Sequence, residues 1–271
     1  MRYREFLEKS LGNELPLPKG YHVVGHVALL TLSIKDCDLV REIGRLTLDY
    51  DSRLKSVITR SGPTTGITRK PEYVLIAGES DTLTTHVENG VMFRIDPLRL
   101  TFSGGNRRER IRLPERVKNH ENVVDMFSCV GQFGLHIAVR TKANVVAIEI
   151  NPEAFGFLEE NIILNNVQDR MKAVFGDCRD VHPLNSADRV IMGFLHDTIK
   201  FLPAALETIS PRGGWIHLHT SIPRSEVQDL CNTISTICLE YGYQSQIVPR
   251  VIKNYSPGIM HYVFDIRLTK D

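Results

Sequence analysis

A regular alternation of short apolar runs with helix-length segments occupies the second part of this 271-residue chain. Segments such as "PEAFGFLEENIILNN" and "SEVQDLCNTISTICLEYGY" are long enough for helices and separate most of these runs. The runs themselves are "NVVDMFS", "ANVVAIEI", "MKAVFGD", "ADRVIMGF", "GGWIHLHT" and "HYVFDIRL". Strands that alternate with helices predict an open α/β domain with a parallel, doubly wound sheet over residues 114–271.

The chain before Pro114 has a different pattern. Residues 1–20 predict a short helical segment, which "ELPLPKG" ends because two prolines and a glycine stop regular structure. In residues 21–113, short strand candidates alternate with turns, "DCDLVREIGRLTLDY" has helical spacing, and "ENG" between two apolar runs signals a hairpin. We therefore expect a small α+β domain over residues 21–113.

Acidic residues stand at the ends of three successive strand candidates of the α/β domain: Asp125, Glu149 and Asp177. In such sheets, ligands bind at the carboxyl ends of the strands. Glu149 can accept both hydroxyls of a ribose, while the Asp177 side chain and the Cys178 backbone can recognise an adenine edge. Alternatively, Glu149 is a surface carboxylate, Asp177 a turn former and Cys178 a small core residue. The common register of the three acidic strand ends favours a cofactor that contains adenosine.

Glycines at positions 131 and 134 follow the first strand, where the chain must turn tightly into a helix. A dinucleotide fingerprint needs a third glycine, but Cys129 stands in its place, so NAD is disfavoured. Cys129 is not expected to act as a nucleophile, because the sequence shows no general base paired with its thiol. The five cysteines show no CxxC spacing, which suits a reducing compartment and predicts no metal site.

Basic residues concentrate just before the α/β domain. Residues 106–118 hold six Lys and Arg against two Asp and Glu, although the whole chain has a formal net charge of only +1. Such a cluster either forms a phosphate-binding face or is a solvated basic surface. No apolar run approaches the length of about 18 residues typical of a membrane-spanning helix, and the first residues are charged and amphipathic. We expect a cytoplasmic protein with no membrane partner.

The strand-end motifs resemble those of class I, Rossmann-like S-adenosylmethionine-dependent methyltransferases: "DMF" with Asp125 and Phe127, "EINP" with Glu149, and "GD" with Asp177. More narrowly, "VVDMFSCVGQFGLHIA", "AIEINPEAFGFLEENIILNNV" and "KNYSPGIMHYVFDI" resemble the archaeal tRNA wybutosine-synthesising protein 2 family and related tRNA guanine-N1 methyltransferases. This resemblance extends from about Leu15 to Leu268. It implies S-adenosylmethionine as cofactor and the anticodon loop of tRNA-Phe as substrate.

Two motifs separate the two reactions of this family. The methyltransferases carry an "N-L-P"-type motif after the fourth strand, where this chain has "MGFLHD". Instead, "TFSGGNRRERIR" resembles the wybutosine enzymes at Ser103, Asn106, Glu109 and Arg112. The resemblance thus implies transfer of the 3-amino-3-carboxypropyl group to C7 of 4-demethylwyosine, with release of 5′-methylthioadenosine. Guanine-N1 methylation is the alternative, and a non-catalytic RNA-binding module is disfavoured because Glu149 and Asp177 are both retained.

The site assignment follows from this resemblance. Arg110 is assigned to the methionine carboxylate, with a hydroxyl contact from Ser103, because an arginine presents a fork of donors to a carboxylate. No general base is assigned; Asp180, His196 and His217 lie near strand ends but suit structural roles equally well. The loop "KNYSPGIMH" lines the RNA side of the site or simply precedes the last strand. The expected cofactor-binding residues are Ser103, Arg110, Asp125, Phe127, Gly131, Glu149, Asp177 and Cys178, and the expected tRNA contacts are Asn106, Arg107, Arg108 and Lys253.

Overall fold

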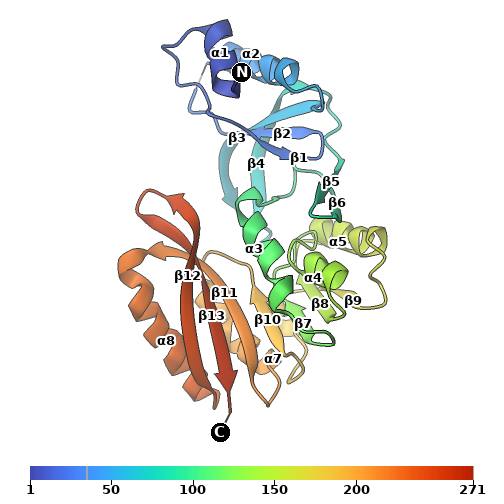
Figure 1. The fold of residues 1–271 in the computed structure, drawn as a ribbon, viewed down its shortest axis with the longest axis vertical. Coiled ribbons are helices and arrows are strands. Elements are labelled where there is room, and N and C mark those ends of the chain that lie inside the picture. Colours follow the sequence, from blue (N-terminus) through green and yellow to red (C-terminus); the bar gives the residue numbers. More distant parts are fainter. Residues whose placement is uncertain (35, 271) are drawn as a thin grey trace. The chain divides into compact units, whose positions relative to one another are not determined.

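The computed structural model describes residues 1–34 and 36–270, which form two compact units, Met1–Gly104 and Gly105–Asp271 (Figure 1). Each unit has its own cluster of buried apolar side chains. The units separate at Gly104, and the domain boundaries expected after residues 20 and 113 stay predictions.

The first unit combines a four-stranded sheet, in the order β1-β2-β3-β4, with two helices and a separate two-stranded hairpin, β5-β6. The hairpin expected at "ENG" is present, and Asn89 and Gly90 both have positive φ, as a two-residue hairpin turn requires. The elements are α1 (Tyr3–Leu11), β1 (His22–Val24), β2 (Val27–Leu30), α2 (Cys37–Tyr50), β3 (Ser56–Thr65), β4 (Lys70–Gly78), β5 (Thr84–Glu88) and β6 (Val91–Ile95).

Helix α2 forms where the helical spacing predicted one. Asp36 caps its first turn by accepting hydrogen bonds from the backbone N–H groups of Asp38 and Leu39. Ile43 and Leu46 lie on its buried face, in the same core cluster as Leu7 of α1. The N-terminal helix therefore belongs to the core of the first unit.

The second unit is an α/β domain with a seven-stranded sheet in the order β12-β13-β11-β10-β7-β8-β9. This confirms the α/β fold class. Its strands are β7 (Asn122–Asp125), β8 (Asn144–Glu149), β9 (Met171–Phe175), β10 (Arg189–Met192), β11 (Gly214–Pro223), β12 (Gln244–Ser256) and β13 (Ile259–Thr269). Its helices are α3 (Arg107–Arg112), α4 (Gly134–Arg140), α5 (Pro152–Leu164), α6 (Cys178–Val181), α7 (Leu202–Thr208) and α8 (Val227–Glu240).

The sheet is mixed rather than wholly parallel. Strands β7 to β11 run parallel, but β13 is antiparallel to both β11 and β12. The sequence prediction missed β12, and its alternative of a simple loop over "KNYSPGIMH" was wrong, because Lys253 and Tyr255 lie in this strand. Strand β12 is a polar edge strand that contains Pro249, so it lacks the apolar run of a central strand. Figure 1 shows β12 and β13 at one edge of the sheet, with α8 beside them.

The strand order reverses beside β7. The chain runs outward from β7 to β8 and β9 and then returns to place β10 on the other side of β7. Ligands of open α/β sheets bind outside the carboxyl ends of the strands at such a switch point. The ends of β7 and β10 therefore mark where a site is expected.

Candidate functional site

Asp125 ends β7 and braces the turn that follows. It is wholly buried, and its two carboxylate oxygens accept hydrogen bonds from the backbone N–H groups of Phe127 (3.3 Å) and Gly134 (3.1 Å). Burial raises the pKa of this carboxyl to about 7, although the two backbone donors oppose the rise. Asp125 thus ties both ends of the loop between β7 and α4, and its direct contact with the cofactor stays a prediction.

The loop itself turns through two residues in the left-handed region. Gly131 has φ +94°, and a Cβ there would lie 2.6 Å from Cδ1 of Leu135, so a side chain would be both strained and crowded. Cys129 has φ +50° and donates its backbone N–H to Glu149. Burial, followed by the nearby Glu149 charge, raises the pKa of the Cys129 thiol to about 12. The thiol therefore stays protonated at neutral pH, in line with the rejection of Cys129 as a nucleophile.

Glu149 closes this loop from the end of β8. One carboxylate oxygen accepts the N–H of Cys129 at 2.6 Å, and the other accepts the N–H of Asn151 at 2.7 Å. Glu149 is 9% exposed, and burial raises its pKa while these backbone donors oppose the rise. Each carboxylate oxygen can accept two hydrogen bonds, so the carboxylate can still receive two hydroxyls. This geometry fits the ribose contact expected from the sequence.

Asp177 and Cys178 follow β9, where the sequence placed them. Asp177 caps α6 by accepting the N–H of Arg179 (2.9 Å) and also forms an ion pair with the Arg179 guanidinium (2.5 Å). The Arg179 hydrogen bond holds the pKa of Asp177 below its usual range. Cys178 is 4% exposed, and its pKa is raised to about 12 chiefly by burial. Recognition of adenine by these two residues stays a prediction, with Arg179 as an additional neighbour.

An aromatic cluster stands at the switch point and was only partly foreseen. The rings of Phe127 and Phe194 stack with centroids 5.3 Å apart, and Phe201 meets Phe127 edge-on at 5.0 Å. The guanidinium of Arg179 lies over the Phe201 ring at 5.1 Å. The sequence prediction named only Phe127 as a binding residue, because Phe194 and Phe201 follow a different strand. The apolar run "GFL" after β10 was the available signal for Phe194.

The arginines of α3 divide by exposure. Arg110 is wholly buried and donates to the side chain of Gln132 at 3.4 Å, whereas Arg107 and Arg108 are exposed. The Nζ atom of Lys253, from β12, lies beside Gly105 just before α3: a Cβ added to Gly105 would lie 2.4 Å from it. Burial, with the nearby charge of Arg110, lowers the pKa of Lys253. A buried guanidinium and a half-buried ammonium therefore lie near each other, and such a pair of cations can bind a carboxylate.

The remaining expected residues are placed as follows. Asn106 is buried, with no partner for its side-chain oxygen among the described residues. Ser103 is half-buried and belongs to the first unit, so its expected contact beside Arg110 stays a prediction. His217 lies in a polar network with Arg189 and Asp265 rather than at the carboxyl end of the sheet.

Within residues 1–34 and 36–270, no three His, Cys, Asp or Glu side chains gather as a metal site would require. No helix in the same ranges combines the length and apolarity needed to cross a membrane.

Two family models match the chain. The TRM5/TYW2 methyltransferase domain matches residues 84–246, and the TYW2 N-terminal domain matches residues 3–82. Together they account for most of the chain, and the first alone covers more than half of it.

Individual relatives agree with these models. The tRNA(Phe) (4-demethylwyosine(37)-C(7)) aminocarboxypropyltransferase of Pyrococcus horikoshii is 41% identical over 99% of this chain and 97% of its own length. The tRNA (guanine(37)-N(1))-methyltransferase Trm5b of Pyrococcus abyssi is 30% identical over 98% of this chain and 80% of its own length.

A crystal structure of P. horikoshii TYW2 in complex with MeSAdo has a TM-score of 0.84 and 38% identity, covering 100% of this chain and 99% of that one. The shared fold, the strand-end carboxylates and these matches agree with one another. The chain therefore belongs to the TRM5/TYW2 family, within which it is a relative of the tRNA wybutosine-synthesising aminocarboxypropyltransferases, and this confirms the resemblance inferred from its motifs.

Proposed function

We propose that this protein transfers the 3-amino-3-carboxypropyl group of S-adenosylmethionine to C7 of 4-demethylwyosine in the anticodon loop of tRNA-Phe. The P. horikoshii relative carries this activity in its name. We also propose a cytoplasmic location and an archaeal source.

The second unit supplies groups that suit the two ends of the cofactor. Glu149 can accept the ribose hydroxyls, and the ring of Phe127, which follows β7, offers an apolar surface. Arg110, with Lys253 nearby, can hold the methionine carboxylate. A fixed tail and a fixed ribose together decide which carbon next to the sulfonium faces the substrate.

S-adenosylmethionine supplies an electrophilic carbon and a neutral thioether leaving group. In the transfer, the bond from C7 to Cγ forms as the bond from Cγ to sulfur breaks, and its electron pair stays on sulfur in 5′-methylthioadenosine. C7 then releases its proton to solvent water, which restores the aromatic ring. Much of the rate enhancement can come from positioning by Arg110 and Glu149. No general base is assigned.

The segment 193–195 carries the choice between the two reactions of the family. The motif resemblance implies an asparagine in this region of the methyltransferases, whereas here Gly193, Phe194 and Leu195 follow β10. The Phe194 ring stacks on Phe127, so this position contributes apolar surface rather than an amide. Guanine-N1 methylation remains the second candidate, because Trm5b is also a relative.

The test is to incubate the protein with S-adenosylmethionine and tRNA that carries 4-demethylwyosine, and then to identify the nucleoside by-product. We expect 5′-methylthioadenosine; S-adenosylhomocysteine would show methyl transfer and overturn the proposal.

A matched pair of variants tests the division between the arginines of α3. Arg110→Ala should raise the KM for S-adenosylmethionine and lower kcat with little change in tRNA affinity. Arg107→Ala should instead weaken tRNA binding and reduce its salt dependence by about one unit of slope. Equal behaviour of the two variants would contradict this assignment.

A further inference from the structure

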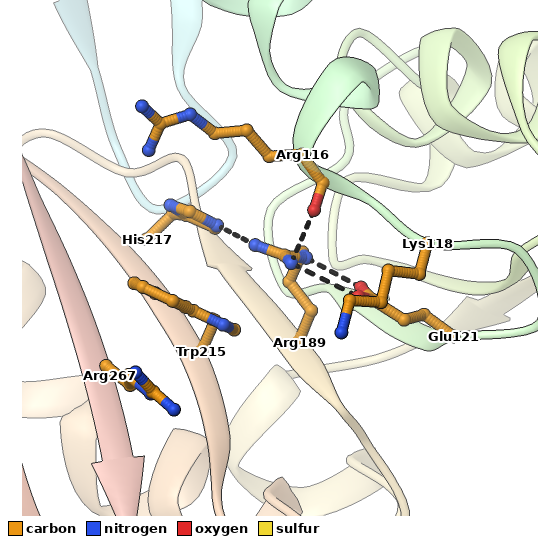
Figure 2. A pocket seen from close by; sticks show the side chains of 7 residues that line it. All are labelled: Arg116, Lys118, Glu121, Arg189, Trp215, His217 and Arg267. Carbon is orange, nitrogen blue, oxygen red and sulfur yellow. Dashed lines mark hydrogen bonds and ion pairs between the residues drawn. The ribbon is translucent and has the colours of Figure 1, made fainter.

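A basic pocket of about 440 Å³ opens in the second unit, apart from the switch point (Figure 2). Four cationic side chains, Arg116, Lys118, Arg189 and Arg267, line it together with one carboxylate, Glu121. Concave surfaces lined by charge of one sign concentrate counter-ions. The pocket is therefore suited to an anion.

The pocket lies at the amino ends of the parallel strands. Arg189 begins β10 and pairs in register with Trp215, near the start of β11, while Glu121 directly precedes β7. Asp125 and Glu149 stand at the opposite, carboxyl ends. Strand β10 has four residues, about 13 Å at 3.3 Å per residue. The pocket is thus distinct from the candidate cofactor site, yet close enough for one RNA to reach both edges.

Arg189 is a buried residue of the pocket lining, held in place by several hydrogen bonds. It is 3% exposed and donates to both oxygens of Glu121 (2.9 and 3.3 Å), to the backbone oxygen of Arg116 (2.9 Å) and to Nε2 of His217 (2.6 Å). Because an arginine only donates, Nε2 of His217 must accept, and the ring proton sits on Nδ1, which donates to Asp265 at 2.7 Å. Arg189 and Glu121 thus offset each other's charge, as the dashed lines in Figure 2 show.

Positive charge remains on the walls. Lys118 and Arg267 are exposed, and neither forms an ion pair with another residue of 1–34 or 36–270. Arg116 reaches Asp265 at 3.3 Å, but that carboxylate also serves Arg250 at 2.6 Å. The pocket therefore has at least two cations whose charge the surrounding protein does not offset.

The Trp215 ring lies beside these cations; the Arg189 guanidinium lies over it at 5.9 Å, and the His217 ring lies parallel to it with ring centroids 6.4 Å apart. Its indole lies among the pocket side chains in Figure 2, and Arg267 is its register partner on β13. Arginine forks and lysine point charges bind phosphate, and bases of single-stranded RNA stack on aromatic rings. The combination of two wall cations with one indole matches a nucleotide, which carries a phosphate and a base.

We propose that this pocket is a second tRNA contact, in which Lys118 and Arg267 hold a backbone phosphate and Trp215 lies against the attached base. The assignment to tRNA rests on the proposed function. The affinity for a nucleotide does not, so the two can fail separately.

Trp215 is the only tryptophan of the chain, so its fluorescence reports on this pocket alone. Adenosine 5′-monophosphate and inorganic phosphate serve as small probes, and a tRNA-Phe transcript serves as the large one. We expect the nucleotide to change the emission saturably and more strongly than phosphate does. The double variant Lys118→Gln/Arg267→Gln should weaken nucleotide binding at least tenfold.

The same double variant should lower tRNA affinity and reduce its salt slope by about two. Lys172→Gln, at an exposed lysine on β9, is the matched control and should change neither quantity. Unchanged tRNA affinity with altered nucleotide binding would make a free nucleotide the ligand and overturn the tRNA assignment. Equal responses to phosphate and nucleotide would overturn the role of Trp215.

If none of the probes gives a saturable response, the site as a whole is refuted. A protein that binds nucleotide and tRNA in this pocket but releases no 5′-methylthioadenosine would refute the proposed function and leave the pocket standing.

Discussion

Arg250 joins two buried carboxylates from different parts of the second unit, and its removal should destabilise that unit strongly. Its guanidinium donates to Asp265 at 2.6 and 3.1 Å and to Glu109 at 2.7 and 3.0 Å. The side chains of Glu109 and Asp265 are each 3% exposed, and that of Arg250 is 21% exposed. Arg250→Met would keep the apolar stem but leave both carboxylates without their main cation.

Breaking a buried ion pair by removing one partner costs about 3 to 5 kcal/mol. The lower end applies here, because Asp265 keeps its hydrogen bond with His217 and Glu109 keeps a 3.5 Å contact with Arg112. A loss of about 3 kcal/mol moves the urea midpoint down by about 1.5 M when the m value is about 2 kcal/mol/M. The fluorescence of the single tryptophan, Trp215, follows the unfolding of this unit.

The deficit should also depend on pH. Burial opposes the charge of Asp265, but the hydrogen bonds from His217 and Arg250 hold its pKa below its usual range. A carboxyl whose pKa is depressed by folding stabilises the folded state at pH values above its unfolded pKa of about 3.9. This stabilisation is lost as the pH falls through the pKa of the folded state. Without Arg250 the pKa of Asp265 rises, so protonation at acidic pH removes the unpaired buried charge from the variant. We therefore expect a smaller deficit at pH 4.5 than at pH 7.

Arg212→Met is the control, because its side chain is 88% exposed and lies 4.0 Å from Asp188. Exposed pairs contribute about 0 to 1 kcal/mol, so this change should leave the midpoint almost unmoved. The reasoning fails if Arg250→Met stays within about 1 kcal/mol of the unmodified protein, or if its deficit is the same at both pH values.

Two further changes test the loop that Asp125 and Glu149 hold. Gly131→Ala should lower the free energy of unfolding by about 2 kcal/mol, because φ is +94° and the new Cβ would lie 2.6 Å from Leu135. Gly156→Ala, in helix α5 with open space around it, should instead stabilise by about 0.5 to 1 kcal/mol. Urea unfolding measures both changes, and a shift of the free energy of unfolding in the same direction for both variants would contradict the strain argument. Glu149→Gln turns an amide toward a backbone N–H, so calorimetry should show at least about tenfold weaker binding of S-adenosylmethionine. Glu159→Gln on the exposed face of α5 should bind it normally, and equal affinities would refute the role of Glu149.

Much of the candidate site could be predicted because its signals are local. Asp125, Glu149 and Asp177 each follow a short apolar run, and Asn151 caps the next helix within a few residues of Glu149. Parallel strands bring such ends to one edge of the sheet whatever the details of packing. The family motifs then indicated the cofactor and the RNA.

Other features depend on contacts between distant segments. Glu109 and Arg250 are 141 residues apart, and nothing in either local sequence shows that they pair. The polar edge strand β12 follows the same rule: its backbone pairs with β13, while its side chains show no apolar run. The roles of neighbouring arginines also depend on which face of α3 packs inward, and this buries Arg110 but exposes Arg107.

The sequence by itself determined the alternation of strands and helices, the carboxylates at the strand ends and the concentration of basic residues before the sheet. Those properties arise from hydrophobic periodicity and turn chemistry, which act over a few residues. Only the tertiary structure decided which cations are buried, which carboxylates they meet and that a basic pocket forms around Trp215. Burial and charge pairing depend on the neighbours that the folded chain brings together, and in this protein those neighbours lie on different strands and helices.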